Sequence, residues 1–259
     1  MEYYMELPGE GLQTEKMPGH WLLARLGKRV LRPGGLELTR QMLDALAITN
    51  DDHVVEFAPG LGITAKLTLA QSPAAYTAVE ADANASEMVQ GYLTGEQQRC
   101  VVGRAENTGL PDVEATVVYG EAMLTMQTPG NKTKIVREAK RLLQPGGRCG
   151  IHEMCLVPDD LAEGTKQEIS RAMSDAIHVG ARPLTIGEWQ TLLENEGFRI
   201  KTISTAPMHL LEPSRIIRDE GIGNTMRIMG NILRDPKSPA SAYRQCARSF
   251  VNIGITWVQ

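Results

Sequence analysis

The stretch that decides the fold is Val54-Val55-Glu56-Phe57-Ala58-Pro59-Gly60-Leu61-Gly62. An apolar run leads into a turn with two glycines, and a helical pattern begins at Ile63. A strand that enters a helix through small residues is typical of an open α/β sheet, in which ligands bind at the carboxyl ends of the strands. Small residues let the backbone approach a ligand closely, and the following helix presents unpaired N–H groups. By itself, the stretch predicts either a ligand site or a tight turn between strand and helix that binds no ligand.

The middle of the chain alternates between short apolar runs and helical patterns, which predicts a mostly parallel sheet with helices on both faces. The expected strands are His53–Phe57, Ala75–Glu80, Arg99–Val102, Ala115–Tyr119 and Gly147–Leu156. The helices expected between them are Ile63–Ala70, Asn84–Leu93 and Lys132–Leu143. The last of these helices runs into Gln144-Pro145-Gly146-Gly147, which reads as a helix stop and a turn.

The two ends of the chain show other patterns. After Leu156, the expected elements are the helices Asp160–Ile177, Thr185–Glu196 and Pro213–Leu233 and the strands Phe198–Ser204 and Arg248–Val258. Two strands so late in the chain indicate an antiparallel edge. Two helical pieces, His20–Val30 and Leu36–Ala47, precede the first strand. We expect one domain over residues 1–259, with a helical lid from 1–50, a cofactor-binding core over 51–156, and lid helices and the last two strands over 157–259.

Composition and sequence pattern argue against several classes of protein. The 259 residues are 42% hydrophobic and 22% charged, and the net charge of −4 comes without a long basic run, so we expect no nucleic-acid partner. No apolar stretch is long enough to span a bilayer, and the first residues lack the pattern of a signal peptide, so a cytoplasmic protein is expected. The four cysteines form no C-x-x-C pair, which predicts reduced thiols and no metal site.

Acidic and polar residues follow the next two expected strands. Glu80 ends the second strand, where a carboxylate can accept hydrogen bonds from both hydroxyls of a ribose. Gly103-Arg104-Ala105-Glu106-Asn107 ends the third, beside the expected place of an adenine. A dinucleotide is the main rival ligand, but its G-x-G-x-x-G fingerprint fails here because Ile63 stands at the third small position. Glu56, close to the turn, suits a cationic ligand better than a phosphate.

These segments resemble the class I S-adenosylmethionine-dependent methyltransferases, in that family's order and spacing. Glu56 to Gly62 is similar to the first motif, (D/E)-x-G-x-G-x-G, and Glu80 matches the ribose-binding acid. Gly103 to Pro111 is similar to G-(D/N)-A-E-x-L-P, and Glu138 to Arg148 to E-x-x-R-V-L-K-P-G-G-R, in the quinone, sterol and arsenite branch. The resemblance implies a Rossmann-like, seven-stranded, mostly parallel sheet with one antiparallel strand. It also implies S-adenosylmethionine as the cofactor.

The resemblance implies cofactor contacts residue by residue. Those expected in the core are Glu56, Ala58, Gly60, Gly62, Glu80, Ala81, Ala105 and Glu106. Gly35, with Arg32, either approaches the methionine carboxylate or belongs to a plain turn between helices.

Two residues depart from the family pattern. Ala58 replaces the usual first glycine, which an ordinary backbone conformation would tolerate. Arg104 stands where Asp or Asn is usual, and because arginine cannot accept a hydrogen bond, the backbone of Ala105, or Glu106, is expected to recognise the adenine.

The sulfonium methyl is already activated, so the protein mainly supplies placement and water exclusion. A base is needed only where the acceptor atom carries a proton that must leave. His152 and Glu153 lie in the fifth strand, and one of these neighbours should face the cofactor side. His178, in a turn between expected lid helices, would grip an acidic substrate or is an ordinary surface residue. Tyr119 would lie, with Glu121, near the methyl group and completes the catalytic candidates.

Three functions stay open from the sequence. The first is S-adenosylmethionine-dependent methyl transfer to a small molecule, and the second is a regulatory or assembly protein that binds this cofactor without methylating. The third is a nicotinamide-dependent oxidoreductase, against which Ile63 argues. The acceptor, its nucleophilic atom and the oligomeric state are not identified by the sequence.

Overall fold

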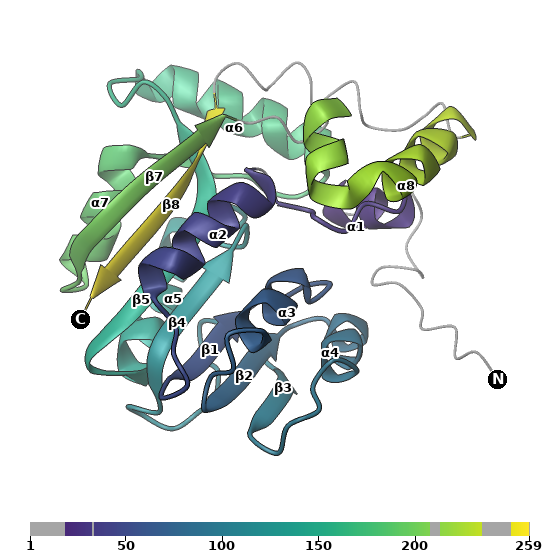
Figure 1. The fold of residues 1–259 in the computed structure, drawn as a ribbon. Helices are drawn as coiled ribbons and strands as arrows, with labels where there is room; N and C mark the ends of the chain where they lie inside the picture. Colours follow the sequence, from purple (N-terminus) through teal and green to yellow (C-terminus); the bar gives the residue numbers. More distant parts are fainter. Residues whose placement is uncertain (1–18, 33, 208–212, 235–249, 259) are drawn as a thin grey trace.

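The computed structural model describes residues 19–32, 34–207, 213–234 and 250–258. Within these residues, eight strands form one sheet at the centre of the molecule (Figure 1). Seven of them lie side by side in the order β3 (Gln98–Val102), β2 (Ala75–Glu80), β1 (His53–Phe57), β4 (Ala115–Glu121), β5 (Leu143–Leu156), β8 (Phe250–Val258) and β7 (Arg199–Pro207). The two-residue β6 (Leu184–Thr185) pairs with β5.

Strand directions agree with the expected fold class. β1 to β6 run parallel wherever they pair, and β8 runs antiparallel to both β5 and β7. β1 lies between β2 and β4, so the winding of the chain reverses beside β1. Ligands of open α/β sheets bind at this reversal, outside the carboxyl ends of the strands. The predicted mostly parallel sheet with one antiparallel strand is confirmed.

Two details of the sheet differ from the expectation. The sequence did not predict β6, because two residues are too few to show a period. The predicted turn Gln144-Pro145-Gly146-Gly147 lies inside β5, where the register against β4 shifts between Ala115 and Val117. Gly146 has a φ of 77° there, a conformation that favours glycine. The turn is therefore an irregularity within a longer strand.

Helices flank both faces of the sheet. Their bounds are α1 (Gly19–Arg25), α2 (Gly35–Leu46), α3 (Ile63–Leu69), α4 (Ala83–Gln90), α5 (Pro129–Leu142), α6 (Glu163–Ile177), α7 (Ile186–Asn195) and α8 (Pro213–Arg234). Local sequence explains several of the starts. The Thr128 side chain accepts a hydrogen bond from Asn131 N, and Pro129 begins α5. Thr185 and Glu188 form a capping box at the start of α7.

Apolar side chains fill both faces of the sheet. On the face covered by α5 and α7, Trp189 and Trp257 are fully buried, and Trp189 Nε1 donates to Met154 O at 3.1 Å. On the opposite face, Met42 of α2 packs against Gly150 of β5, where a Cβ would lie 3.1 Å from Met42 Cγ. The glycine in β5 thus allows α2 to lie close to the sheet, directly beside the predicted site.

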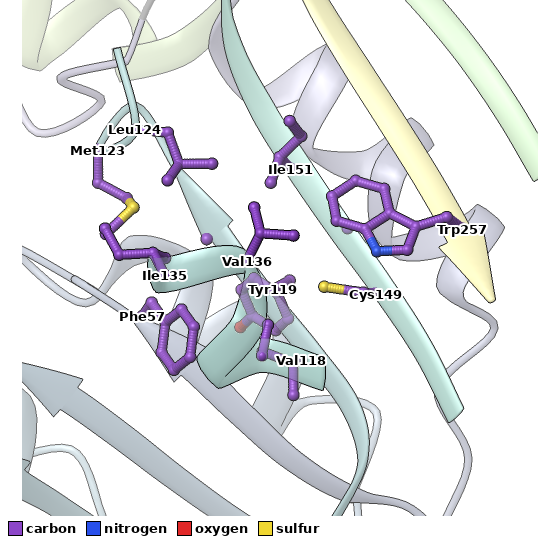
Figure 2. Close-up of a pocket in the computed structure, with 13 residues that line it drawn as sticks. Phe57, Val118, Tyr119, Met123, Leu124, Ile135, Val136, Cys149, Ile151 and Trp257 are labelled. Atoms are coloured by element: carbon purple, nitrogen blue, oxygen red, sulfur yellow. The ribbon is translucent and has the colours of Figure 1, made fainter. Parts of the chain in front are cut away.

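A small apolar pocket lies within the core on the α5 side (Figure 2). Phe57, Val118, Met123, Cys149 and Trp257 are among the residues that line it. Burial raises the pKa of the Cys149 thiol far above its ordinary value, so the thiol stays protonated. A lining of this kind offers little to a polar ligand. We interpret the pocket as imperfect core packing.

The helix α8 is fastened to the segment between α1 and α2, beside which it lies (Figure 1). The Glu220 carboxylate accepts hydrogen bonds from Arg29 N and Val30 N, both at 2.8 Å, and lies 3.5 Å from Lys28 Nζ. Asn224 Nδ2 donates to Gly27 O at 2.9 Å. These contacts join α8 to the segment that follows α1 and form one helical cover. None of the described helices is long and apolar enough to cross a membrane.

Glu220→Ala is expected to loosen this cover. Hydrogen bonds to a charged group each contribute about 1.5–3 kcal/mol. Amide exchange at Arg29 and Val30 should therefore speed up about tenfold to a hundredfold, as measured by hydrogen–deuterium exchange with NMR detection. The control is Arg218→Ala, which removes an exposed ion pair of α8 with Glu37 and should leave both amides unchanged. Equal exchange in the Glu220 variant and the wild type would contradict the role of Glu220.

Candidate functional site

The turn between β1 and α3 is built on positive φ angles. Gly60 has a φ of 56°, and a Cβ at this position would meet no atom within 4 Å. Gly62 has a φ of 72°, and its Cβ would lie 2.7 Å from the Tyr92 ring. Gly62 is therefore required for both conformation and space, whereas Gly60 faces open room. This is the arrangement expected of a turn that a ligand approaches.

Ala58 does not have the ordinary backbone conformation that the sequence analysis allowed for. Its φ is 52°, in the left-handed region, and its N–H donates to Val79 O at 2.8 Å. The hydrogen bond continues the pairing of β1 with β2 and holds Ala58 in this conformation. A Cβ there lies close to the following carbonyl, so Ala58 is strained.

Ala58→Gly is expected to raise the free energy of unfolding by about 0.5–1 kcal/mol. The substitution removes strain of about 1–2 kcal/mol, which is offset in part by the greater freedom of glycine in the unfolded chain. Urea denaturation followed by circular dichroism measures the change. The control is Ala70→Gly, at an ordinary φ of −66°, which should destabilise the protein instead. A less stable Ala58 variant would show that φ at this position is not left-handed.

Glu80 lies beside the turn, at the end of β2. It is 6% exposed, its Oε2 accepts from Gly60 N at 3.0 Å, and its Oε1 accepts from Asp82 N at 3.0 Å. Burial raises the pKa of the Glu80 carboxyl, and the backbone hydrogen bonds that the carboxylate accepts lower it by a smaller amount. Ala81, the next residue, is exposed. The structure thus brings Gly60, Glu80 and Ala81 together, as the sequence predicted.

The end of β3 continues this edge of the site. Gly103 N donates to Glu80 O at 2.8 Å, and Ala105 is 9% exposed within the core. Arg104 points to solvent and pairs with Glu106, with 2.6 Å between Nε and Oε1. Partial burial opposes ionisation of Glu106, but the hydrogen bond and positive charge of Arg104, together with a backbone hydrogen bond, lower the pKa. Arg104 is therefore held by its neighbour Glu106.

Glu56 lies beneath the turn, in a buried network of hydroxyl groups. Its Oε2 accepts hydrogen bonds from the hydroxyls of Tyr76, at 2.5 Å, and Tyr119, at 2.7 Å. The Tyr119 hydroxyl also lies 2.6 Å from Thr68 Oγ1. Burial raises the pKa of Glu56 to about 7. Tyr119 is 1% exposed, so the structure gives it a place in this network instead of an open position beside an acceptor.

A second buried cluster surrounds Glu121, where β4 ends. Glu121 Oε1 lies 2.6 Å from Thr39 Oγ1 and 2.8 Å from His152 Nδ1. Its Oε2 lies 2.5 Å from Thr64 Oγ1 and 3.2 Å from Arg32 Nε. We call these five residues the Glu121 cluster. Burial alone would raise the pKa of Glu121, but Arg32 and His152 outweigh burial and hold it at about 2, so the carboxylate is ionised.

The Glu121 cluster joins four segments around the carboxyl end of the sheet. Thr64 is two residues after Gly62 of the turn, Thr39 is in α2, and His152 is in β5. Two nitrogen atoms of the cluster, His152 Nε2 and Arg32 Nη2, are buried without a hydrogen-bond partner among the described residues. Buried polar groups are almost always paired, so two such atoms in one cluster indicate a place for a ligand.

Comparison with known proteins agrees with this geometry. A family model described as "Methyltransferase domain" matches residues 55–151. The chain belongs to the class I S-adenosylmethionine-dependent methyltransferases. An uncharacterized protein of Haemophilus influenzae is 36% identical to this methyltransferase over 220 residues, which are 83% of this chain and 86% of the relative. S-Adenosylmethionine is accordingly the cofactor, and the quinone, sterol and arsenite branch stays a prediction.

Solved structures show the same fold at low sequence identity. YcgJ of Bacillus subtilis is 16% identical, with a TM-score of 0.63 over 86% of this chain and 98% of that one. A geranyl diphosphate methyltransferase bound to GPP and sinefungin is 14% identical, with a TM-score of 0.62 over 85% and 76%. A Haemonchus contortus phosphoethanolamine N-methyltransferase bound to S-adenosylhomocysteine is 12% identical, with a TM-score of 0.69 over 97% and 59%. At these identities, the similarities show that the chain shares the fold of these proteins.

Glu153 of the methyltransferase faces away from the Glu121 cluster. It accepts hydrogen bonds from Met123 N at 2.9 Å, Leu124 N at 2.7 Å, and Thr125 N and Oγ1 at 3.0 and 2.6 Å. It is 1% exposed, and burial raises its pKa. Only His152 of the two neighbours reaches the cluster, as the alternation of a strand requires. Glu153 anchors the loop that follows β4.

The remaining predicted residues lie at the helical cover. His178 is exposed at the C-terminal cap of α6, outside the Glu121 cluster. Gly35 begins α2 with a φ of 60°, and a Cβ there would lie 2.3 Å from Asp219 Oδ2 of α8. Leu36 N donates to Asp219 Oδ1 at 3.2 Å, so a carboxylate of the protein itself meets the N terminus of α2. Sequence reasoning missed Thr39 and Thr64, whose patterns are those of ordinary helix residues.

Proposed function

We propose that S-adenosylmethionine lies along the carboxyl ends of β1, β2 and β3. The open room at Gly60 and the carboxylate of Glu80 beside it fit a nucleoside, because an acid at this place can accept from both ribose hydroxyls. In this proposal, Gly60 and Gly62 hold the methionine and ribose portion. Ala81, Ala105 and Glu106 border the adenine. When bound, the cofactor supplies a methyl group activated by a sulfonium.

We further propose that the methyl acceptor is a small molecule. The supporting observation is the enclosure of the Glu121 cluster: the side chains of Glu121 and His152 are 7% and 1% exposed. Water exclusion of this degree favours displacement chemistry on an acceptor that is enclosed with the cofactor. Two relatives of the same fold carry small acceptors in their names, geranyl diphosphate and a phosphoethanolamine. The cover that Glu220 fastens is suited to such an acceptor.

The test is methyl transfer from radiolabelled S-adenosylmethionine to an extract divided by size. One fraction holds molecules below about 1 kDa, and the others hold protein and RNA. We expect label in the small-molecule fraction and stoichiometric release of S-adenosylhomocysteine. Label in protein or RNA would contradict the small-molecule acceptor. Cofactor binding without release of S-adenosylhomocysteine from any fraction would favour the alternative of a regulatory or assembly protein.

A further inference from the structure

Two contacts at the end of β4 hold His152, one through its backbone and one through its side chain. The register of the sheet pairs His152 with Glu121, and Ala122 N donates to His152 O at 2.8 Å. The ring is 1% exposed, and its Nδ1 lies 2.8 Å from Glu121 Oε1. Neither His152 nor Glu121 can shift along its strand without breaking the pairing of β4 and β5. The orientation of the imidazole is therefore set by the sheet.

The charge of Glu121 decides which ring nitrogen carries hydrogen. An ionised carboxylate can only accept, so Nδ1 of His152 is the donor. In the neutral imidazole, Nε2 then has a free lone pair. That atom is buried and has no donor among the described residues. A buried acceptor left without a donor costs about 1–3 kcal/mol, so a bound ligand that offers a hydrogen-bond donor is stabilised there.

Among the described residues, two charged groups belong to the cluster around this ring. Arg32, from the segment before α2, contacts Glu121, and Glu121 lies on β4. Thr39 of α2 and Thr64 of α3 are uncharged and donate to Glu121. On β8, the residue paired with His152 is Gly254, which has no side chain. Among the residues that the structure describes, Glu121 is therefore the only carboxylate in contact with the ring, and it contacts Nδ1.

We propose that His152 Nε2 takes a proton from the methyl acceptor, and that the acceptor nucleophile is a weakly acidic O–H or S–H group, that is, a phenol, an enol or a thiol. The proposal rests on the proposed function and names its substrate class. Histidine is the side chain best matched to protons of such groups near neutral pH. Tertiary amines and thioethers attack through a lone pair without losing a proton, so they would leave Nε2 without a use.

The step balances in atoms and charge. A bond forms between the acceptor oxygen or sulfur and the methyl carbon, while the carbon–sulfur bond of the sulfonium breaks with its electron pair on sulfur. The acceptor proton passes to Nε2 and later to water. One positive charge leaves the sulfonium, and one appears on the imidazole. Glu121, at 2.8 Å from Nδ1, stabilises the imidazolium and is in this sense a positioning residue.

The first test needs no acceptor. Protein labelled with ¹⁵N-histidine is studied by NMR with S-adenosylhomocysteine bound, at pH 8. We expect His152 to carry hydrogen on Nδ1 and none on Nε2. A His152 ring with hydrogen on Nε2 at this pH would overturn the proposal. His53→Asn assists the assignment, because His53 is exposed at the opposite end of β1.

The second test uses His152→Asn, whose amide nitrogen can replace Nδ1 as the donor to Glu121. Wild type and variant are assayed with a panel of phenols, enols and thiols, and with a matched panel of tertiary amines and thioethers. We expect turnover in the first panel and a kcat about 10²–10⁴-fold lower in the variant. The dependence of kcat on pH in the wild type should disappear in His152→Asn, and His53→Asn should retain it.

The outcomes separate this proposal from the proposed function. Turnover confined to tertiary amines or thioethers, or an unchanged kcat and pH profile in His152→Asn, would overturn the assignment of the proton acceptor. S-Adenosylhomocysteine binding is measured by calorimetry in both proteins and should be equal within about threefold, a difference of about 0.7 kcal/mol. Failure of the wild type to bind would instead refute the proposed cofactor site, whatever the NMR result.

Discussion

Glu80→Ala is expected to weaken binding of S-adenosylmethionine by about 100-fold to 10,000-fold. In the proposed site, the carboxylate accepts hydrogen bonds from both ribose hydroxyls, and each bond to a charged group contributes about 1.5–3 kcal/mol. The same carboxylate holds Gly60 N at 3.0 Å, so the turn also loses its order. Isothermal titration calorimetry with S-adenosylhomocysteine gives the Kd of each protein.

Two further variants make this experiment decisive. Glu80→Gln keeps one acceptor oxygen and should show an intermediate Kd. Glu87→Ala removes an exposed carboxylate of the neighbouring helix α4 and should bind as the wild type does. Circular dichroism confirms that each variant is folded. A folded Glu80→Ala protein with the wild-type Kd would refute the ribose contact and, with it, the proposed course of the cofactor along the sheet.

Glu153→Leu is expected to lower the free energy of unfolding by about 3–5 kcal/mol. The substitution leaves three buried N–H groups and the Thr125 hydroxyl without an acceptor, and each unpaired group costs about 1–3 kcal/mol before the loop relaxes. Lys132, whose pKa of about 8 is lowered mainly by burial, also loses the attraction of Glu153. Urea denaturation measures the change, and the Tm should fall by about 10 °C in a protein of this size.

The conservative variant separates anchoring from chemistry. Glu153→Gln retains one acceptor oxygen and should lose less stability than Glu153→Leu does. Glu194→Leu, at an exposed position of α7, is the control and should change stability by less than about 0.5 kcal/mol. A Glu153→Leu protein as stable as the wild type would contradict the anchoring role. A Glu153→Gln protein of normal stability and lost kcat would support the catalytic role that the sequence predicted.

Much of the sheet could be predicted because its signals are local. β1 and β2 begin and end where the apolar runs predicted, since each run is bounded by charged or turn residues. The glycine turn and Glu80 are equally local, because a parallel βαβ unit places consecutive strand ends side by side. By contrast, β6 is too short to show a pattern, and the left-handed φ of Ala58 depends on the hydrogen bond to Val79.

The roles of Glu121, His152 and Glu153 required contacts between distant parts of the chain. His152 and Glu153 are equal candidates in sequence, and the pleat of β5 turns one toward Glu121 and the other toward the loop after β4. Thr39 carries no signal of a site, yet it lies 113 positions before His152 and contacts the same carboxylate. Only the packing of α2 on β5 brings these residues together.

The amino-acid sequence by itself determined the order of the longer strands and of the helices, the glycine turn and the acid that closes β2, because these depend on neighbours in the chain. Tertiary structure alone decided which polar side chains share the Glu121 cluster. It also decided that Tyr119 is buried against Glu56 and that Glu153 is buried against Thr125. The physical reason is that the ionisation and hydrogen bonding of a buried group depend on whatever packs around it, and that packing comes from distant segments.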